Sequence, residues 1–176
     1  MSDFAAAAEV VLQHEGGWVS NPRDPGGETN WGISTSFIRR EGLTSAELGV
    51  DPDTAGRPGW LKPMPRACAV ELYRRCFWDR YAYGCIVDQA VATKVFDASV
   101  NIGPRRAHAR AQVVVGVSAD GLLDPVSFAA LNAFEPRAFV ASYAAQLAAY
   151  YRELVTERPS LAEFLPNWLH RAAWGA

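Results

Sequence analysis

Residues 15–33 read EGGWVSNPRDPGGETNWGI, and this stretch decides how the fold is interpreted. It is rich in Gly, Pro and Asn, which break helices and form turns. We therefore expect a structured loop with a short hairpin that begins at residues 18–20. The stretch starts with Glu15, reaches Asp24 nine residues later, and reaches Thr29 five residues after that. A loop that folds back would bring these two carboxylates and the hydroxyl close together.

Two carboxylates that flank one glycosidic bond meet the requirement for sugar hydrolysis. A protonated one donates to the leaving oxygen, and an ionised one activates water or stabilises positive charge. Glu15 stands near apolar residues such as Leu12 and Trp31, and an apolar setting suits a carboxyl to the role of acid. Asp24 lies in a polar loop and is expected to stay ionised. The alternative interpretation is that Glu15 is a surface residue near a helix end and Asp24 belongs to an Asx turn.

The segment before the loop is predicted to be the helix that carries Glu15. Ser2 or Asp3 can cap its start, and the glycines at 16–17 can end it. Its apolar residues recur at helical spacing on the side that also carries Glu15. This pattern places an acid at a helix end, beside a loop.

The rest of the chain also favours helices, because apolar residues recur at helical spacing and no stretch shows the sustained alternation of a half-buried strand. The sequence therefore predicts a mainly α protein. The expected helices are 34–40, 65–81, 88–103, 104–115, 124–133 and one that starts at Pro136, followed by a closing apolar segment at 161–169. Residues 42–63 are rich in Pro and Gly and are predicted to be a surface segment with short helical turns near 46–48 and 53–55.

Composition narrows the class of protein. The chain has 176 residues, 49% of them hydrophobic and 20% charged, which predicts one domain, or one domain with a small appendage. A net charge of −2 gives no field that would hold nucleic acid or an anionic membrane. Cys68, Cys76 and Cys85 form no CxxC pair and match no zinc-site spacing. We expect them to be buried, reduced thiols.

We expect no targeting signal in this sequence. No Lys or Arg precedes Arg23, so the basic segment of a secretory signal peptide is missing. No apolar run approaches the roughly 20 residues needed to span a bilayer. We expect synthesis in the cytoplasm without a signal peptide and no stable membrane insertion.

Three blocks of the sequence resemble a known family. EGGWVSNPRDPGGETNWGIS (15–34) looks like the N-terminal signature of the glycoside hydrolase family 108 N-acetylmuramidases, found in phage endolysins and as secretion-associated muramidases. ELYRRCFWDRY (71–81) and VFDASVNIG (95–103) are similar to two further blocks of that family. Residues 104–171 resemble the predicted peptidoglycan-binding portion that follows.

The resemblance implies a lysozyme-like helical fold with a small loop or hairpin next to the catalytic helix. It also implies a catalytic muramidase portion at 1–94 and a C-terminal helical, predicted peptidoglycan-binding portion at 95–176. Since the block at 95–103 is expected to pack against the catalytic cleft, we expect both portions to form one fold.

The resemblance also assigns roles to single residues. The glutamate of the Glu-Gly-Gly motif is the catalytic acid of the family, which carries over to Glu15. Asp24 matches the second carboxylate of phage-type lysozymes in spacing. Thr29 resembles the threonine that helps to position water there, although four residues rather than five separate it from Asp24. Trp18 replaces the usual Tyr or Phe after Glu-Gly-Gly, and Asp97 is a reserve candidate for the second carboxylate.

Several aromatic residues lie in or beside the segments expected to form the cleft: Trp18, Trp31, Trp78, Tyr81 and Tyr83. Sugar rings stack on flat apolar faces, so Trp18, Trp31 and Tyr81 are predicted to bind substrate. Asn101 is predicted to hydrogen-bond an acetamido or hydroxyl group. The alternatives are that the tryptophans are core residues and that Asn101 caps the end of a helix.

These features predict a peptidoglycan hydrolase, a lysozyme-type N-acetylmuramidase that cleaves the β-1,4 bond between N-acetylmuramic acid and N-acetylglucosamine. No metal or organic cofactor is required for this chemistry. We expect a monomer that acts on peptidoglycan glycan strands in the periplasm after release through a holin or a dedicated export route. The alternatives are a lytic transglycosylase, which uses a lone catalytic acid, and a non-catalytic wall-binding or secretion-accessory protein.

Overall fold

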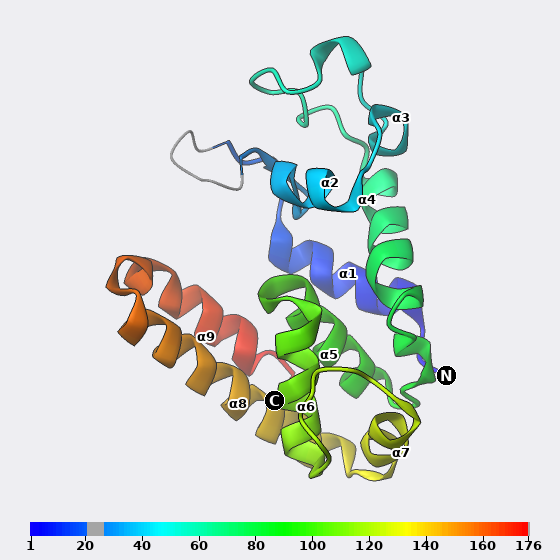
Figure 1. Cartoon of the computed structure of the whole chain (residues 1–176), viewed down its shortest axis with the longest axis vertical. Helices are drawn as coiled ribbons and strands as arrows, with labels where there is room; N and C mark the ends of the chain where they lie inside the picture. Colours follow the sequence, from blue (N-terminus) through cyan, green and yellow to red (C-terminus); the bar gives the residue numbers. More distant parts are fainter. Residues whose placement is uncertain (21–26, 176) are drawn as a thin grey trace. The chain divides into compact units, whose positions relative to one another are not determined.

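The computed structural model describes residues 1–20 and 27–175, and over these ranges it holds nine α-helices and one two-stranded sheet (Figure 1). The predicted mainly α, lysozyme-like fold is confirmed. The chain divides into two compact units. We call Ala8–Cys76 the hairpin unit, and Met1–Ala7 together with Phe77–Ala176 the helical unit.

The first helix, α1 (Phe4–Glu15), starts in the helical unit and ends in the hairpin unit. Asp3 caps its start, because its Oδ1 accepts the Ala6 N–H at 2.8 Å. Gly16 ends it with a φ of 69°, in the left-handed region that suits glycine. Both ends therefore lie where the sequence predicts them, and Glu15 is the last residue of the helix.

The other elements of the hairpin unit are β1 (Thr29–Asn30), β2 (Ile33–Ser34), α2 (Thr35–Glu41), α3 (Ser45–Leu48), η1 (Pro52–Thr54) and α4 (Arg66–Tyr73). Ser34 caps α2 by accepting the Phe37 N–H at 3.1 Å. The short helical turns predicted within residues 42–63 are confirmed as α3 and η1.

The prediction of one α-helix over residues 65–81 is wrong in its second half. α4 ends at Tyr73 and continues as η2 (Arg74–Asp79), a π-helical turn. A π-turn holds more residues than an α-turn, so the inward face shifts along the chain. Three consecutive residues, Cys76, Phe77 and Trp78, are buried as a result.

The helical unit contains η3 (Tyr83–Cys85), α5 (Gln89–Ile102), α6 (Pro104–Val115), α7 (Pro125–Ala133), α8 (Pro136–Glu157), η4 (Pro159–Phe164) and α9 (Leu165–Ala173). The predicted helix starts are confirmed. Asp88 accepts the Val91 N–H at 3.0 Å, and Asp124 accepts the Ser127 N–H at 2.7 Å. No helix in the described ranges is both long and apolar enough to cross a bilayer.

The core of the helical unit is built around α5, in which residues 91–99 are all buried. α5 packs against α6 and α8. Phe96 lies at the centre of an aromatic cluster, with ring centroids 5.5 Å from Trp78 and 5.7 Å from Tyr83. Trp78 and Tyr83 are 5% and 0% exposed, so both are core residues rather than sugar contacts.

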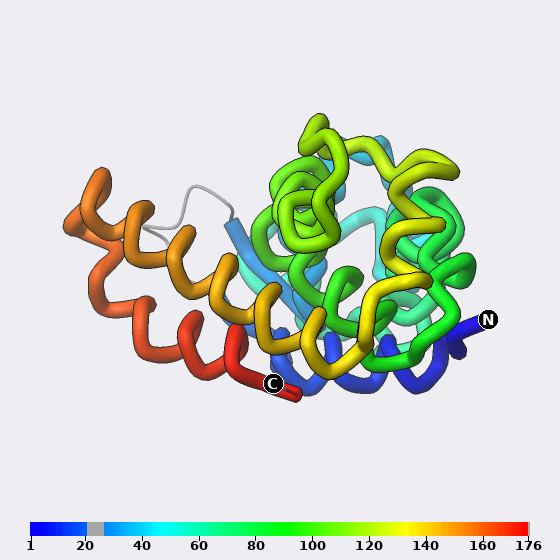
Figure 2. The backbone as a smooth tube through the Cα atoms, turned by 90° about the horizontal axis from the view of Figure 1, so that it is seen from below, coloured from blue at the N-terminus to red at the C-terminus, as the bar shows by residue number. Residues whose placement is uncertain are grey.

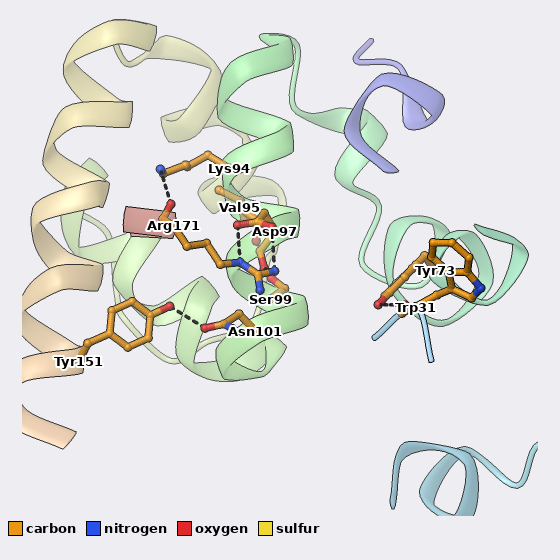
Figure 3. A network of polar contacts seen from close by, with 9 residues as sticks. All are labelled: Trp31, Tyr73, Lys94, Val95, Asp97, Ser99, Asn101, Tyr151 and Arg171. Carbon is orange, nitrogen blue, oxygen red and sulfur yellow. Dashed lines mark hydrogen bonds and ion pairs between the residues drawn. The ribbon is translucent and has the colours of Figure 1, made fainter. Parts of the chain in front are cut away.

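The last helix, α9, runs beside α8 (Figure 2) and is fastened to α5 by two buried charges. Lys94 Nζ donates to the carbonyl oxygens of Ala172, at 2.6 Å, and of Trp174. Arg171 binds Asp97 through two parallel bonds, Nη2 to Oδ1 at 2.8 Å and Nε to Oδ2 at 3.0 Å (Figure 3). The buried Lys94 and Asp97 therefore bind the C-terminal residues 171–174 to α5.

The expectation of three buried thiols holds only for Cys76. Cys68 is half-buried and Cys85 is exposed. Cys85 ends the 3-10 turn η3, which has about three residues per turn. Residues two positions apart therefore point to different sides. Tyr83 points into the core, so Cys85 points outward.

We expect Arg171→Met to lower the free energy of unfolding by about 3–5 kcal/mol, because it leaves the Asp97 carboxylate buried without its partner. Urea denaturation followed by circular dichroism measures this loss. The matched control is Arg66→Met, which breaks the exposed ion pair with Glu9 and is expected to cost about 0.5 kcal/mol or less. Equal small losses in both variants would show that the Asp97–Arg171 pair does not hold α9.

Candidate active site

The hairpin of the hairpin unit turns at Trp31 and Gly32. β1 and β2 are antiparallel, and Asn30 faces Ile33 across a two-residue turn. Both turn residues have positive φ, 51° at Trp31 and 78° at Gly32. This pair of angles is typical of a type I′ turn, and it is costly for Trp31, which has a Cβ.

Val19 pairs with Thr29 of β1 in an isolated antiparallel bridge. Its N–H donates to the Thr29 carbonyl at 2.8 Å, and the Thr29 N–H donates to the Val19 carbonyl at 2.9 Å. The hairpin predicted to begin at residues 18–20 is formed instead by β1 and β2, and of those three residues only Val19 pairs with it, through a single bridge to Thr29. Thr29, the predicted helper of the second carboxylate, is fixed by its backbone between Val19 and Ser34.

Two polar side chains tie the hairpin to the loop before α4. Asn30 is 3% exposed, and its Nδ2 donates to the Leu61 carbonyl at 2.8 Å. The Glu28 carboxylate accepts the backbone N–H groups of Gly59 and Leu61. These bonds satisfy the buried polar groups of a segment that has little regular structure of its own.

The Trp31 side of the turn is held by a buried tyrosine. Tyr73, on α4, is 1% exposed, and its hydroxyl donates to the Trp31 carbonyl at 2.9 Å (Figure 3). The Trp31 indole N–H donates to the Met64 carbonyl at 3.2 Å. The turn is therefore bonded on both its backbone and its side chain.

Glu15 lies directly against this turn. A Cβ placed on Gly32 would lie 2.6 Å from Glu15 Cγ, 2.8 Å from Glu15 Oε2 and 2.1 Å from the Tyr73 hydroxyl oxygen. Any side chain at position 32 would collide with both groups. A half-buried carboxyl held at a helix end beside a loop is a group that can give a proton to a leaving oxygen.

Two further predicted site residues of the segment 15–33 are Trp18, a predicted substrate contact, and Asp24, the predicted second carboxylate. Trp18 is 38% exposed, and its indole N–H donates to Glu28 Oε2 at 3.5 Å. Lys62 Nζ lies 5.3 Å from the centre of the Trp18 ring, within the range of a cation–π contact. Asp24 lies outside the described residues.

The remaining two predicted substrate residues belong to the helical unit. Tyr81 is half-buried, and its ring meets the His108 ring edge-on at 5.2 Å. Asn101 is half-buried in the last turn of α5, and its Oδ1 accepts the Tyr151 hydroxyl at 2.6 Å (Figure 3). The structure therefore brings Glu15 and Trp31 together in one unit and places Tyr81 and Asn101 in the other.

Asp97, the reserve candidate for the second carboxylate, is 3% exposed and bound on both oxygens by Arg171. This pairing makes it a structural residue of α5. Among residues 1–20 and 27–175, no three His, Cys, Asp or Glu side chains gather as a possible metal-binding group.

Sequence reasoning missed three residues of this site: Gly32, Tyr73 and Glu28. Gly32 carried a signal, because glycine is preferred in two-residue hairpin turns, whose residues need positive φ. Tyr73 lies in the helix predicted for residues 65–81, and nothing local shows that its hydroxyl meets a residue 42 positions earlier.

Comparisons with known proteins give a family match that includes the residues of this site. A family model described as glycosyl hydrolase 108 matches residues 8–103. Among solved structures, the chain is similar to Brucella abortus SagA, with 26% sequence identity and a TM-score of 0.70 over 96% of this chain and 92% of that one. No protein with a curated description matches the chain.

Next to Tyr81, His108 is held in its neutral form. It is 2% exposed, its Nδ1 lies 3.1 Å from the Gly121 carbonyl, and its Nε2 lies 2.8 Å from the Tyr83 hydroxyl. A carbonyl only accepts, so Nδ1 carries the proton and Nε2 accepts from Tyr83. Burial lowers the pKa of His108 from 6.5 to about 4.

This depressed pKa predicts a loss of stability in mild acid. The unfolded chain takes up a proton at His108 below pH 6.5, whereas the folded chain does so only near pH 4, so stability is complete above pH 6.5 and falls between these values. The loss from this group is about 3 kcal/mol. Urea denaturation at pH 7 and pH 4.5 measures it.

The control is His108→Asn, which removes the titrating ring. We expect this variant to be less stable than the wild type at pH 7 and the difference to shrink at pH 4.5. A difference that is constant over this range would show that His108 does not titrate between the two states.

Proposed function

Because the chain belongs to the glycosyl hydrolase 108 family and is therefore a glycoside hydrolase, we propose that it is a lysozyme-type N-acetylmuramidase. Family membership supports hydrolysis of peptidoglycan in general. The bond we assign is the β-1,4 bond between N-acetylmuramic acid and N-acetylglucosamine. The observation that carries the proposal is the placement of the Glu15 carboxyl against the Trp31–Gly32 turn, within the matched range 8–103.

In the proposed mechanism, Glu15 protonates the leaving glycosidic oxygen. Asp24, with Thr29, orients the attacking water or stabilises the oxocarbenium-like transition state. Thr29 suits such a role because the hairpin fixes its backbone on both edges. Eight residues separate Glu15 from Asp24 in the sequence, a spacing short enough for the two carboxyls to reach one substrate.

The substrate contacts that we propose use stacking and hydrogen bonds. Trp18 and Trp31 offer aromatic faces near Glu15 in the chain, and Tyr81 offers one in the helical unit. Asn101 is suited to an acetamido group, because its Oδ1 is occupied by the Tyr151 hydroxyl and its Nδ2 is the side that donates.

We further propose that the helical portion after residue 103 contacts peptidoglycan through basic side chains. Arg105, Arg106 and Arg110 line a hollow of about 590 Å³ at the start of α6, where the three guanidinium groups outnumber the one carboxylate, that of Asp120. Arg110 is held in place by the Tyr150 ring, 4.2 Å from its guanidinium carbon. Peptide stems carry carboxylates, which arginine binds well.

We expect Glu15→Gln to abolish clearing of purified Gram-negative sacculi, because the amide keeps the shape of the side chain and has no acidic proton to donate. Turbidity and mass spectrometry of the released fragments measure this. The wild type is expected to leave reducing N-acetylmuramic acid ends. The control, Glu153→Gln, changes an exposed carboxylate on α8 and is expected to keep full activity.

Other outcomes identify the alternatives. Fragments that end in 1,6-anhydro-N-acetylmuramic acid, lighter by one water, together with full activity of Asp24→Asn, would identify a lytic transglycosylase. If the wild type binds sacculi as well as Glu15→Gln does and neither releases fragments, the protein is a non-catalytic wall-binding or accessory protein.

The basic hollow predicts a charge effect on sacculus binding. In the Glu15→Gln background, we expect Arg105→Glu with Arg106→Glu to reduce the fraction that sediments with sacculi, and added salt to reduce the binding of the parent. The matched control reverses two exposed arginines of the same unit, Arg152 and Arg158. Equal binding by both double variants would contradict a role for the hollow.

A further inference from the structure

Three segments that are far apart in the chain meet at Gly32, where there is no room for a methyl group. Glu15 ends α1, Gly32 lies in the hairpin turn, and Tyr73 ends α4. A Cβ on Gly32 would lie 2.1 Å from the Tyr73 hydroxyl oxygen and 2.6 Å from Glu15 Cγ. The hydroxyl and the acid therefore lie on the same small surface.

The Tyr73 hydroxyl has a fixed direction. Its only proton goes to the Trp31 carbonyl, because a carbonyl oxygen can only accept. The ring is 1% exposed, so it cannot swing into solvent without opening the unit. Towards any further neighbour the oxygen offers only lone pairs.

The turn that supports the hydroxyl is fixed as well. Trp31 donates from its indole to the Met64 carbonyl, and Asn30 donates to the Leu61 carbonyl. These bonds hold Trp31 at a φ of 51°, which a residue with a Cβ rarely adopts. Strain of this kind persists only where the surroundings enforce it, and it gathers near functional sites.

We propose that Tyr73 is a positioning residue for Glu15, and that its hydroxyl and the bare backbone of Gly32 together form the wall that keeps the Glu15 carboxyl in its proton-donating orientation. This inference rests on the proposed function of Glu15. It assigns a role to a residue that never needs to touch substrate. Small misplacements of a catalytic group reduce the rate strongly, so the wall is expected to act on turnover rather than on binding.

The first test compares Tyr73→Phe with Tyr143→Phe. Tyr143 is a matched control, because its buried hydroxyl also donates to one backbone carbonyl, that of Ala107 at 3.0 Å, and it lies in the helical unit. Both variants lose one such bond, and we expect both to lower Tm by a few degrees. Only Tyr73→Phe is expected to lower kcat, by about tenfold or more, with KM changed less than about twofold.

The second test changes the other component of the wall, Gly32. Gly32→Ala is expected to lower both Tm and kcat. Adding Tyr73→Phe to Gly32→Ala removes the nearest atom that the new methyl meets. The double variant is therefore expected to regain part of the Tm that Gly32→Ala loses. kcat is not expected to return, because the contact with Glu15 Cγ remains. A recovery of kcat together with Tm would mean that both variants act through stability alone, which would overturn the proposal.

The outcomes separate the inference from the function on which it rests. If the wild type releases no fragments from solubilised peptidoglycan, the muramidase assignment fails and the role of Tyr73 fails with it. If the wild type is active and Glu15→Gln is not, but Tyr73→Phe keeps the kcat of Tyr143→Phe, the assignment holds and only the positioning role is overturned.

Discussion

The conformation of one two-residue turn governs the hairpin unit. Trp31 and Gly32 both have positive φ, which aligns β1 with β2 and turns the Trp31 carbonyl to the Tyr73 hydroxyl. With no side chain at Gly32, α1 can bring Glu15 against the turn. The strand pairing, the seating of α4 and the location of the acid therefore depend on the same few backbone angles.

The helical unit solves a different problem, which is to bury charge without leaving it unpaired. α5 is enclosed by apolar side chains but carries Lys94 and Asp97, each less than 4% exposed. α9 supplies what both need, carbonyl oxygens for the ammonium and a guanidinium for the carboxylate. Buried charges are tolerated only with such partners. The position of the last helix is consequently dictated from within the core.

The sequence predicts those features whose physical cause is local. Asp3, Gly16 and Asp124 mark helix ends because a cap acts on its own neighbours, and the structure has the helices there. The π-turn after Tyr73 was not predictable, because no residue near Tyr73 marks in the sequence where the α-helical pattern gives way to η2. The same holds for the site. Glu15 carries a motif, whereas the contact between Tyr73 and Trp31 joins residues 42 positions apart, and that between Arg171 and Asp97 joins residues 74 apart.

The three cysteines differ in their accessibility, and this difference distinguishes a buried thiol of the hairpin unit from an exposed thiol of the helical unit. Cys76 is buried in the hairpin unit, whereas Cys85 is exposed in the helical unit. A thiol reagent will modify Cys85 in the native protein at a rate set by its own chemistry. Cys76 can react only when its surroundings open, so its labelling rate reports local opening of the hairpin unit. The chain thus carries its own probe for fluctuations of the segment that bears Glu15.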